Sequence, residues 1–212
     1  MSRAFTSEEY EVPDMPVIDV KTESVSEDHD LVSSYSAGRS VTDPALPFEI
    51  GMNFLKGENG FFKSIDFAVK WLKRSADLGH VQAAVELAKI YLSDTKKYGY
   101  KETAQLLRMA SENGSEEATS MLDMGSIADV KTKSAFVKYR LNAELGNTDA
   151  MIALAEGFEK EYYAKQKWKT AAMWYLRACA RGAESARPRL EELVKAKNIE
   201  LTEDEKKLLK RY

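Results

Sequence analysis

Apolar residues recur at spacings of three and four from about Pro47 onward, and this pattern predicts a series of amphipathic helices. In the segment 64–78 the apolar side consists of Ile65, Ala68, Val69, Leu72 and Ala76. The expected helices form pairs, at about 64–78 with 81–92, 101–112 with 115–124, 133–145 with 148–161, and 167–181 with 184–196. A short helix at about 47–57 precedes the pairs. A last helical segment, from Glu203 to Arg211, follows Thr202, which is a suitable N-cap.

Four glycines stand between the two helices of successive pairs, at Gly79, Gly114, Gly146 and Gly182. Their separations of 35, 32 and 36 residues lie in the range of helical repeat arrays. Each glycine is placed to end the first helix of its pair in the left-handed conformation. The fourth residue after each glycine is an alanine and the eighth is a leucine: Ala83, Ala118, Ala150, Ala186, Leu87, Leu122, Leu154 and Leu190. The pattern indicates stacked copies of one helix hairpin rather than a reaction centre.

These residues resemble the Sel-like repeat (SLR) family, relatives of the tetratricopeptide repeats, whose unit is similar to A-x₂-W-Y-x₂-A-A-x₂-G-x₃-A-x₃-L-G-x₂-Y. The resemblance covers about residues 47–196. The positions that carry it, and that we expect to be structural, are Ala68, Trp71, Ala76, Gly79, Ala83, Leu87, Gly114, Ala118, Gly146, Ala150, Leu154, Trp174, Gly182 and Ala186. A tetratricopeptide unit would place its glycine inside the first helix, so the glycine position favours the Sel-like family.

The resemblance implies an all-α fold, an α-solenoid with the form of a right-handed superhelix, built from about 3.5–4 helix-turn-helix repeats. It further implies a non-enzymatic scaffold or adaptor that binds another protein. The second unit departs from the pattern, because Asp123 and Ser126 stand where an apolar or small residue and an aromatic residue are expected. We therefore expect the second helix of that unit to be short or irregular.

The charge distribution divides the chain into unequal parts. Residues 1–44 have no helical or strand period and carry three basic against ten acidic residues, a net charge of −7, whereas the rest carries +4. We expect a disordered acidic arm at 1–44, a solenoid at 45–200 and a capping helix at 201–212. The arm is a candidate intramolecular competitor for a basic surface of the solenoid, and a solubilising tail is the alternative interpretation.

Composition excludes several classes of protein. The formal net charge is only −3, which argues against a nucleic-acid partner for the chain as a whole. No run of apolar residues is long enough for membrane insertion, and the N-terminus lacks the pattern of a secretory signal. The single Cys179 rules out an internal disulfide, so we expect a cytoplasmic protein.

The sequence offers little for catalysis or metal binding. The histidines, His29 and His80, are far apart in the chain, so we expect no catalytic site, metal or cofactor. Cys179 is expected to be an inert buried thiol. The rings of Trp71 and Trp174 occupy the family's packing position, and we expect both in the core.

The candidate partner-binding surface is a basic face on the first helices of the pairs. Lys73, Arg108 and Arg140 all stand six residues before a turn glycine, where Leu176 occupies the fourth unit. The full candidate set is Lys70, Lys73, Arg74, Arg108, Arg140, Arg177 and Arg181. If the first helices line the concave face, these cations form a ladder that binds an acidic or extended peptide. A merely solvated helix face is the alternative, and a regulatory subunit or bacterial effector acting on an enzyme or secretion complex is the alternative function.

Overall fold

The computed structural model describes residues 32–40 and 42–211, and these residues form helices and turns without a strand. The chain divides into two compact units, Met1–Gly38 and Arg39–Tyr212. In the described part of the first unit, residues 32–35 are helical and Ser36 Oγ donates a hydrogen bond to the carbonyl of Val32 (2.7 Å). The second unit holds the predicted repeats and all the features discussed below.

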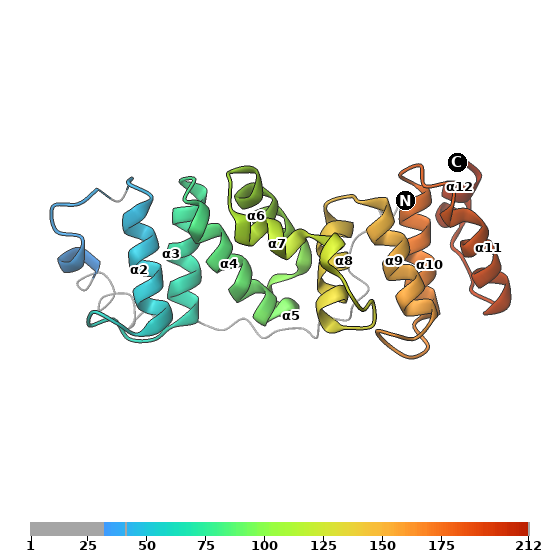
Figure 1. Cartoon of the computed structure of the whole chain (residues 1–212), viewed down its shortest axis with the longest axis horizontal. Helices are drawn as coiled ribbons and strands as arrows, with labels where there is room; N and C mark the ends of the chain where they lie inside the picture. The colour runs from blue at the N-terminus through green and yellow to red at the C-terminus, as the bar shows by residue number, and fades with distance from the viewer. Residues whose placement is uncertain (1–31, 41, 212) are drawn as a thin grey trace. The chain divides into compact units, whose positions relative to one another are not determined.

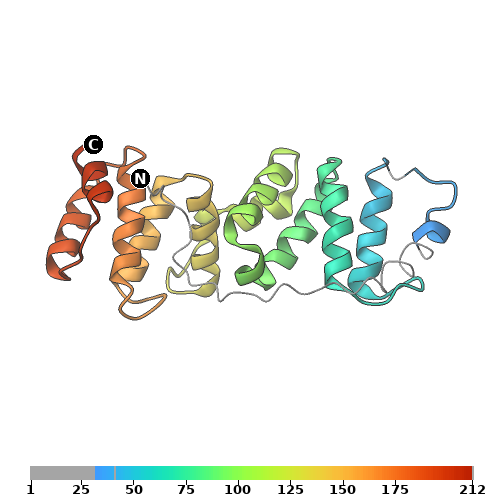
Figure 2. The ribbon, with the colours of Figure 1, turned by 180° about the vertical axis from the view of Figure 1, so that it is seen from behind.

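In the second compact unit the helix hairpins follow one another in chain order along a row (Figure 1), as the view from behind also shows (Figure 2), and α12 lies back beside α10. The helices are α2 (Ala45–Lys56), α3 (Ile65–Asp77), α4 (Val81–Ser93), α5 (Thr95–Tyr98), α6 (Tyr100–Glu112), α7 (Glu116–Leu122), α8 (Lys133–Glu144), α9 (Thr148–Glu159), α10 (Trp168–Cys179), α11 (Ala186–Ala196) and α12 (Glu203–Arg211). Four hairpins, α3–α4, α6–α7, α8–α9 and α10–α11, occupy the predicted ranges. The all-α repeat fold is thereby confirmed, and α5 is an addition that the sequence pattern did not predict.

The four turn glycines adopt one conformation, with φ of 90°, 88°, 96° and 88° in chain order. In the first hairpin, the N–H of Gly79 donates to the carbonyl of Ala76 (2.9 Å), and that of His80 donates to the carbonyl of Ser75 (3.0 Å). The same two bonds recur at Gly114, Gly146 and Gly182. This is the Schellman ending of a helix, in which a left-handed residue lets the last free carbonyls find donors. The repeated glycine is therefore a helix terminator in every hairpin.

The residue directly after the glycine begins the second helix, a signal that the sequence analysis missed. His80 Nδ1 accepts a hydrogen bond from the N–H of Ala83 (3.1 Å), and Ser115 and Asn147 side chains cap the equivalent positions of α7 and α9. Side-chain acceptors at the N-cap satisfy one of the free N–H groups of the first turn. Ala183 has no such acceptor, and α11 accordingly starts only at Ala186.

His80 makes the start of α4 sensitive to pH. Its ring stacks on Phe48 (centroids 4.4 Å apart), and burial lowers the pKa of His80 below its ordinary value of 6.5, against the opposing charge of Asp43. Between the folded and unfolded pKa values the unfolded chain binds more protons. The contribution of His80 to the free energy of unfolding is therefore fully present above the unfolded pKa and is lost as the pH falls through the folded pKa. Protonation also removes the Nδ1 acceptor.

We expect the variant His80→Asn to keep the N-cap, as Asn147 does in α9, and to lose this part of the pH dependence. Urea unfolding of both proteins above and below about pH 6.5 measures the difference. The wild-type midpoint should fall more on acidification than the variant midpoint. Identical pH slopes for the two proteins would contradict this role of His80.

Two clusters of buried side chains run along the array. One contains Leu72, Leu87 and Leu107 from α3, α4 and α6, and the other contains Leu154, Tyr175 and Leu190 from α9, α10 and α11. Leu141 of α8 is completely buried in the first cluster, against which Val137 and Leu145 also pack, whereas most buried residues of its hairpin belong to the second. This leucine therefore links the N-terminal and C-terminal halves of the core.

The second repeat, the α6–α7 hairpin, is irregular, as predicted, because α7 has only seven residues and is followed by a 3₁₀ turn at Met124–Ser126. Two polar residues of α8 hold the carbonyls at its end. Lys138 Nζ donates to the carbonyls of Ser120 (2.8 Å) and Asp123 (2.9 Å), and Asn142 Nδ2 donates to that of Leu122 (2.8 Å). Cations near a helix C-terminus satisfy its free carbonyls. The shortened helix is thus closed by its neighbour.

The two ends of the array are formed differently. At the N-terminal end, α2 approaches α3 so closely that a Cβ on Gly51 would lie 3.0 Å from the backbone nitrogen of Leu72. At the C-terminal end, the N–H of Thr202 donates to Glu205 Oε2 (2.6 Å) and the N–H of Glu205 donates to Thr202 Oγ1 (3.3 Å). This reciprocal capping box starts α12, with Thr202 as the predicted N-cap.

The compact unit that holds the repeats includes residues before 45, the predicted start of the solenoid. Arg39 forms an ion pair with Glu49 of α2 (2.7 Å), and Ser75 Oγ of α3 donates to the carbonyl of Pro44 (2.6 Å). Ser75 is completely buried, so its hydroxyl needs this acceptor. The segment from Arg39 to Pro44 therefore belongs to the second unit, with residue 41 outside the described residues.

Candidate partner-binding surface

The predicted cation ladder is a row of ion pairs. Each of its three cations pairs with a carboxylate one helical turn further on: Lys73 Nζ with Asp77 Oδ1 (3.5 Å), Arg108 Nε with Glu112 Oε1 (3.8 Å), and Arg140 Nη2 with Glu144 Oε1 (2.7 Å). Leu176, at the same level of α10, is buried. We call this position, six residues before each turn glycine, the matched level. It presents both signs of charge on α3, α6 and α8, and its cations are not free. The carboxylates were visible in the sequence four residues after each cation, a spacing that brings side chains together on a helix.

The other predicted cations have no ion pair with any residue that the structure describes. Lys70 and Arg74 are exposed on α3. Arg177 is half-buried on α10, and Arg181 is exposed just beyond the end of that helix. The first helices thus carry uncompensated positive charge at two places, one at the α3 end of the array and one at α10.

Trp174 brings two of the predicted cations together. Its ring is 3% exposed, and the guanidinium carbons of Arg140 and Arg177 lie 4.6 Å and 4.7 Å from its centroid. Arg140 also lies 5.4 Å from the ring centroid of Tyr100 on α6. An arginine within about 6 Å of an aromatic centroid is attracted by the negative face of the ring. Residues of α6, α8 and α10 therefore meet around Arg140.

Most of the predicted structural positions are buried. Ala68, Ala76, Ala83, Leu87, Ala118, Ala150, Leu154, Trp174 and Ala186 are each no more than 3% exposed. Trp71 differs, because it is only partly buried and its ring lies 5.8 Å from the guanidinium carbon of Arg74. No first helix of an earlier hairpin precedes α3 in the described residues, so nothing equivalent to Arg140 covers this tryptophan. The expected core position of Trp71 is therefore only partly realised.

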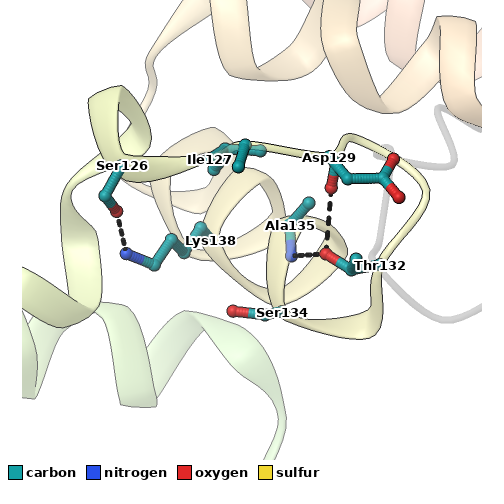
Figure 3. Close-up of a pocket in the computed structure, with 8 residues that line it drawn as sticks. Ser126, Ile127, Asp129, Thr132, Ser134, Ala135 and Lys138 are labelled. Atoms are coloured by element: carbon teal, nitrogen blue, oxygen red, sulfur yellow. Dashed lines mark hydrogen bonds between the residues drawn. The ribbon is translucent and has the colours of Figure 1, made fainter.

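A pocket of about 230 Å³ lies beside the irregular second repeat, between the 3₁₀ turn that follows α7 and α8 (Figure 3). Lys138 lines it, but its Nζ is engaged by the Ser126 hydroxyl (2.6 Å) and by the two carbonyls at the end of α7. Thr132 Oγ1 accepts from the N–H of Ala135 (3.1 Å) and donates to the carbonyl of Asp129 (3.0 Å). These groups are occupied in holding helix ends. Ser126 Oγ in turn donates to the carbonyl of Asp123 (2.9 Å), so the serine and the lysine of the pocket belong to the hydrogen bonds that close α7.

Other candidate chemical groups are also in structural use. Cys179 is 3% exposed, and burial raises the pKa of its thiol, which disfavours the reactive thiolate. His80 serves as an N-cap. Among residues 32–40 and 42–211, no three His, Cys, Asp or Glu side chains are grouped as a metal site would require. None of the helices described is both long enough and apolar enough to cross a membrane.

The predicted acidic arm lies mainly outside the described residues, which begin at residue 32. His29 and nine of the ten acidic residues assigned to the arm belong to that part of the chain. Its disorder and its contact with a basic surface stay predictions.

The chain is similar to two solved helical-repeat structures. One is a protective antigen present in uropathogenic Escherichia coli strains that displays an SLR fold, with 20% identity, a TM-score of 0.36, and a match over 80% of this chain and 36% of that chain. The other is a Sel1 repeat protein from Oxalobacter formigenes, with 25% identity, a TM-score of 0.34, and a match over 80% of this chain and 70% of that chain. This chain therefore spans about a third of the length of the first.

No family model matches the chain, and no curated protein matches its sequence. Both TM-scores are low, so the repeat fold is established by the chain's own four hairpins and their equivalent glycine turns. Of these two structures, one is described as displaying an SLR fold and the other as a Sel1 repeat protein.

Proposed function

We propose that this chain is a non-catalytic scaffold whose first helices, α3, α6, α8 and α10, bind an extended segment of a partner protein. The observation that carries the proposal is the matched level of ion pairs on three successive first helices, at Lys73, Arg108 and Arg140. The first helices recur once in each hairpin along the array. A segment lying along them would therefore meet one cation and one carboxylate at each of the first three hairpins.

The described side chains support a binding role better than a catalytic one. Exposed ion pairs contribute little to stability, about 0–1 kcal/mol each, so folding alone gives little reason for charges at a matched level. The ion pairs on α3 and α6 are more than half exposed and can exchange their partners for groups of another protein. The polar groups of the pocket, in contrast, are occupied by hydrogen bonds within the fold.

A photo-crosslinking residue placed at Gln105 tests the proposal. Gln105 is exposed on α6, one turn before Arg108, whereas Lys195 is equally classed as exposed on the second helix α11 and serves as the matched control position. We expect a specific cross-linked partner from position 105 and none from position 195. Equal cross-linking from both positions, or none from position 105, would contradict a binding surface on the first helices. Turnover of a small molecule by the purified protein alone would contradict a non-catalytic role.

A further inference from the structure

Three arginines converge near the α8–α9 turn, where Glu144 is the described carboxylate that acts on two of them. Arg140 and Arg177 share the Trp174 ring, at 4.6 Å and 4.7 Å from its centroid. Arg181 reaches back to the same turn, because its Nε lies 3.8 Å from the position that a Cβ on Gly146 would take. Glu144 pairs with Arg140 and is the one carboxylate whose charge acts on Arg177. We call Arg140, Arg177 and Arg181 the arginine cluster.

The cluster is electrostatically undersatisfied. Burial lowers the pKa of Arg177 below its ordinary value, and the neighbouring positive charges of Arg140 and Arg181 lower it further, against the single opposing charge of Glu144. The Nε of Arg140 is buried and has no hydrogen-bond partner. Neither Arg177 nor Arg181 forms an ion pair with a described residue. An added anion would relieve the repulsion among the three guanidinium groups, which cannot lose their protons at neutral pH.

The shape of the cluster suits a carboxylate. Two of the guanidinium groups lie over the Trp174 ring, and a guanidinium presents paired donors that match the two oxygens of a carboxylate. Arg181 is exposed and Arg177 is half-buried, so the outer edge of the cluster is accessible from solvent. By contrast, the α3 end has Arg74 beside the half-buried Trp71 but no second arginine over that ring.

We propose that the arginine cluster is the anchor site of the scaffold and binds a Glu or Asp side chain of an acidic segment in the partner protein. This inference rests on the proposed function and makes it more specific, because it places recognition at α8 and α10 rather than along an even ladder of cations. The anchor carboxylate would accept hydrogen bonds from Arg177 and Arg181 while Arg140 supports the base of the site.

The test measures binding of a fluorescein-labelled peptide of alternating Glu and Gly to the full chain by fluorescence anisotropy. The double variant Arg177→Gln with Arg181→Gln should weaken binding about tenfold or more. It removes the two charged donors of the site, and hydrogen bonds to charged groups contribute more than bonds between neutral groups. The matched control is Lys70→Gln with Arg74→Gln, which removes the same charge and one cation–π contact at the α3 end. We expect the control to change affinity by less than about threefold.

A second variant tests the cluster by gain of affinity. Glu144→Gln removes the described carboxylate that acts on Arg140 and Arg177, so the peptide should bind several-fold more tightly than to the wild-type chain. This experiment does not require the arginine double variant to fold. Circular dichroism checks that each protein is folded. Equal weakening by both double variants, an unchanged affinity of the Arg177 and Arg181 variant, or equal binding of a Gln and Gly peptide would each overturn the proposal. Cross-linking from Gln105 that survives the arginine variant would retain the scaffold and remove only this anchor site.

Discussion

Replacing Phe54 by alanine is expected to lower the free energy of unfolding by about 3–5 kcal/mol, the range for deleting a buried aromatic side chain. Phe54 on α2 is completely buried, and its ring contacts those of Phe61, Phe62 and Phe67, with centroids 4.8 Å, 5.4 Å and 5.1 Å away. The substitution removes both the buried area and the aromatic contacts, which are worth about 0.5–1.5 kcal/mol per pair beyond their area. Urea unfolding monitored by circular dichroism measures the change.

Phe62 supplies the matched control for this prediction. It belongs to the same group of rings but is 48% exposed, so Phe62→Ala should cost about 1 kcal/mol or less. In a repeat array each hairpin contacts only its neighbours, and the loss at Phe54 should act first on the nearby helices. Hydrogen exchange should therefore accelerate in α2 and α3 before α10 and α11. A uniform acceleration, or equal effects of the two substitutions, would show that Phe54 does not anchor this end.

Leu141→Ala is expected to cost about 2–5 kcal/mol and to separate the unfolding of the two halves of the array. Leu141 is completely buried on α8 but belongs to the cluster formed by α3, α4 and α6. Because α7 has only seven residues, less of the second repeat is available to join these halves. The other apolar side chains of this hairpin that pack against the same cluster, Val137 and Leu145, are only partly buried, so we expect a cavity at Leu141 to turn a single transition into two.

Leu78 provides the comparison for Leu141. It is 42% exposed at the first helix turn, and Leu78→Ala should change stability by no more than about 0.5 kcal/mol. Calorimetry of the two variants and the wild-type chain distinguishes one transition from two. A large cost at Leu141 with a single retained transition would mean that the two halves remain coupled by other contacts.

The helices and turns followed from local patterns in the sequence. A helix places residues three and four apart on one face, so the apolar stripe of residues 64–78 is visible without any knowledge of its neighbours. The left-handed conformation of Gly79 is likewise a local requirement of the helix end. The departure at Asp123 and Ser126 foretold the short α7 for the same reason. The N-cap at His80 was also local, but a histidine acceptor is an unusual N-cap and was not predicted.

The candidate site depended less on local pattern. Asp77, Glu112 and Glu144 were readable four residues after the cations, and this signal would have revealed the ion pairs. The two tryptophans at the same repeat position could not be distinguished in this way. Trp174 is covered by Arg140 from the preceding hairpin, whereas Trp71 stands on the first of the four hairpins.

The sequence by itself determined the repeat, its glycine turns and the approximate lengths of the hairpin helices, because these features depend on contacts within a few residues. Only the tertiary structure decided where charge is left uncompensated. Arg140 and Arg177 stand on different helices and meet over Trp174 because α8 and α10 belong to adjacent hairpins in the array. Interactions between residues distant in the chain depend on how the helices pack. The spacing of residues along the sequence does not give the distance in space between residues on different helices.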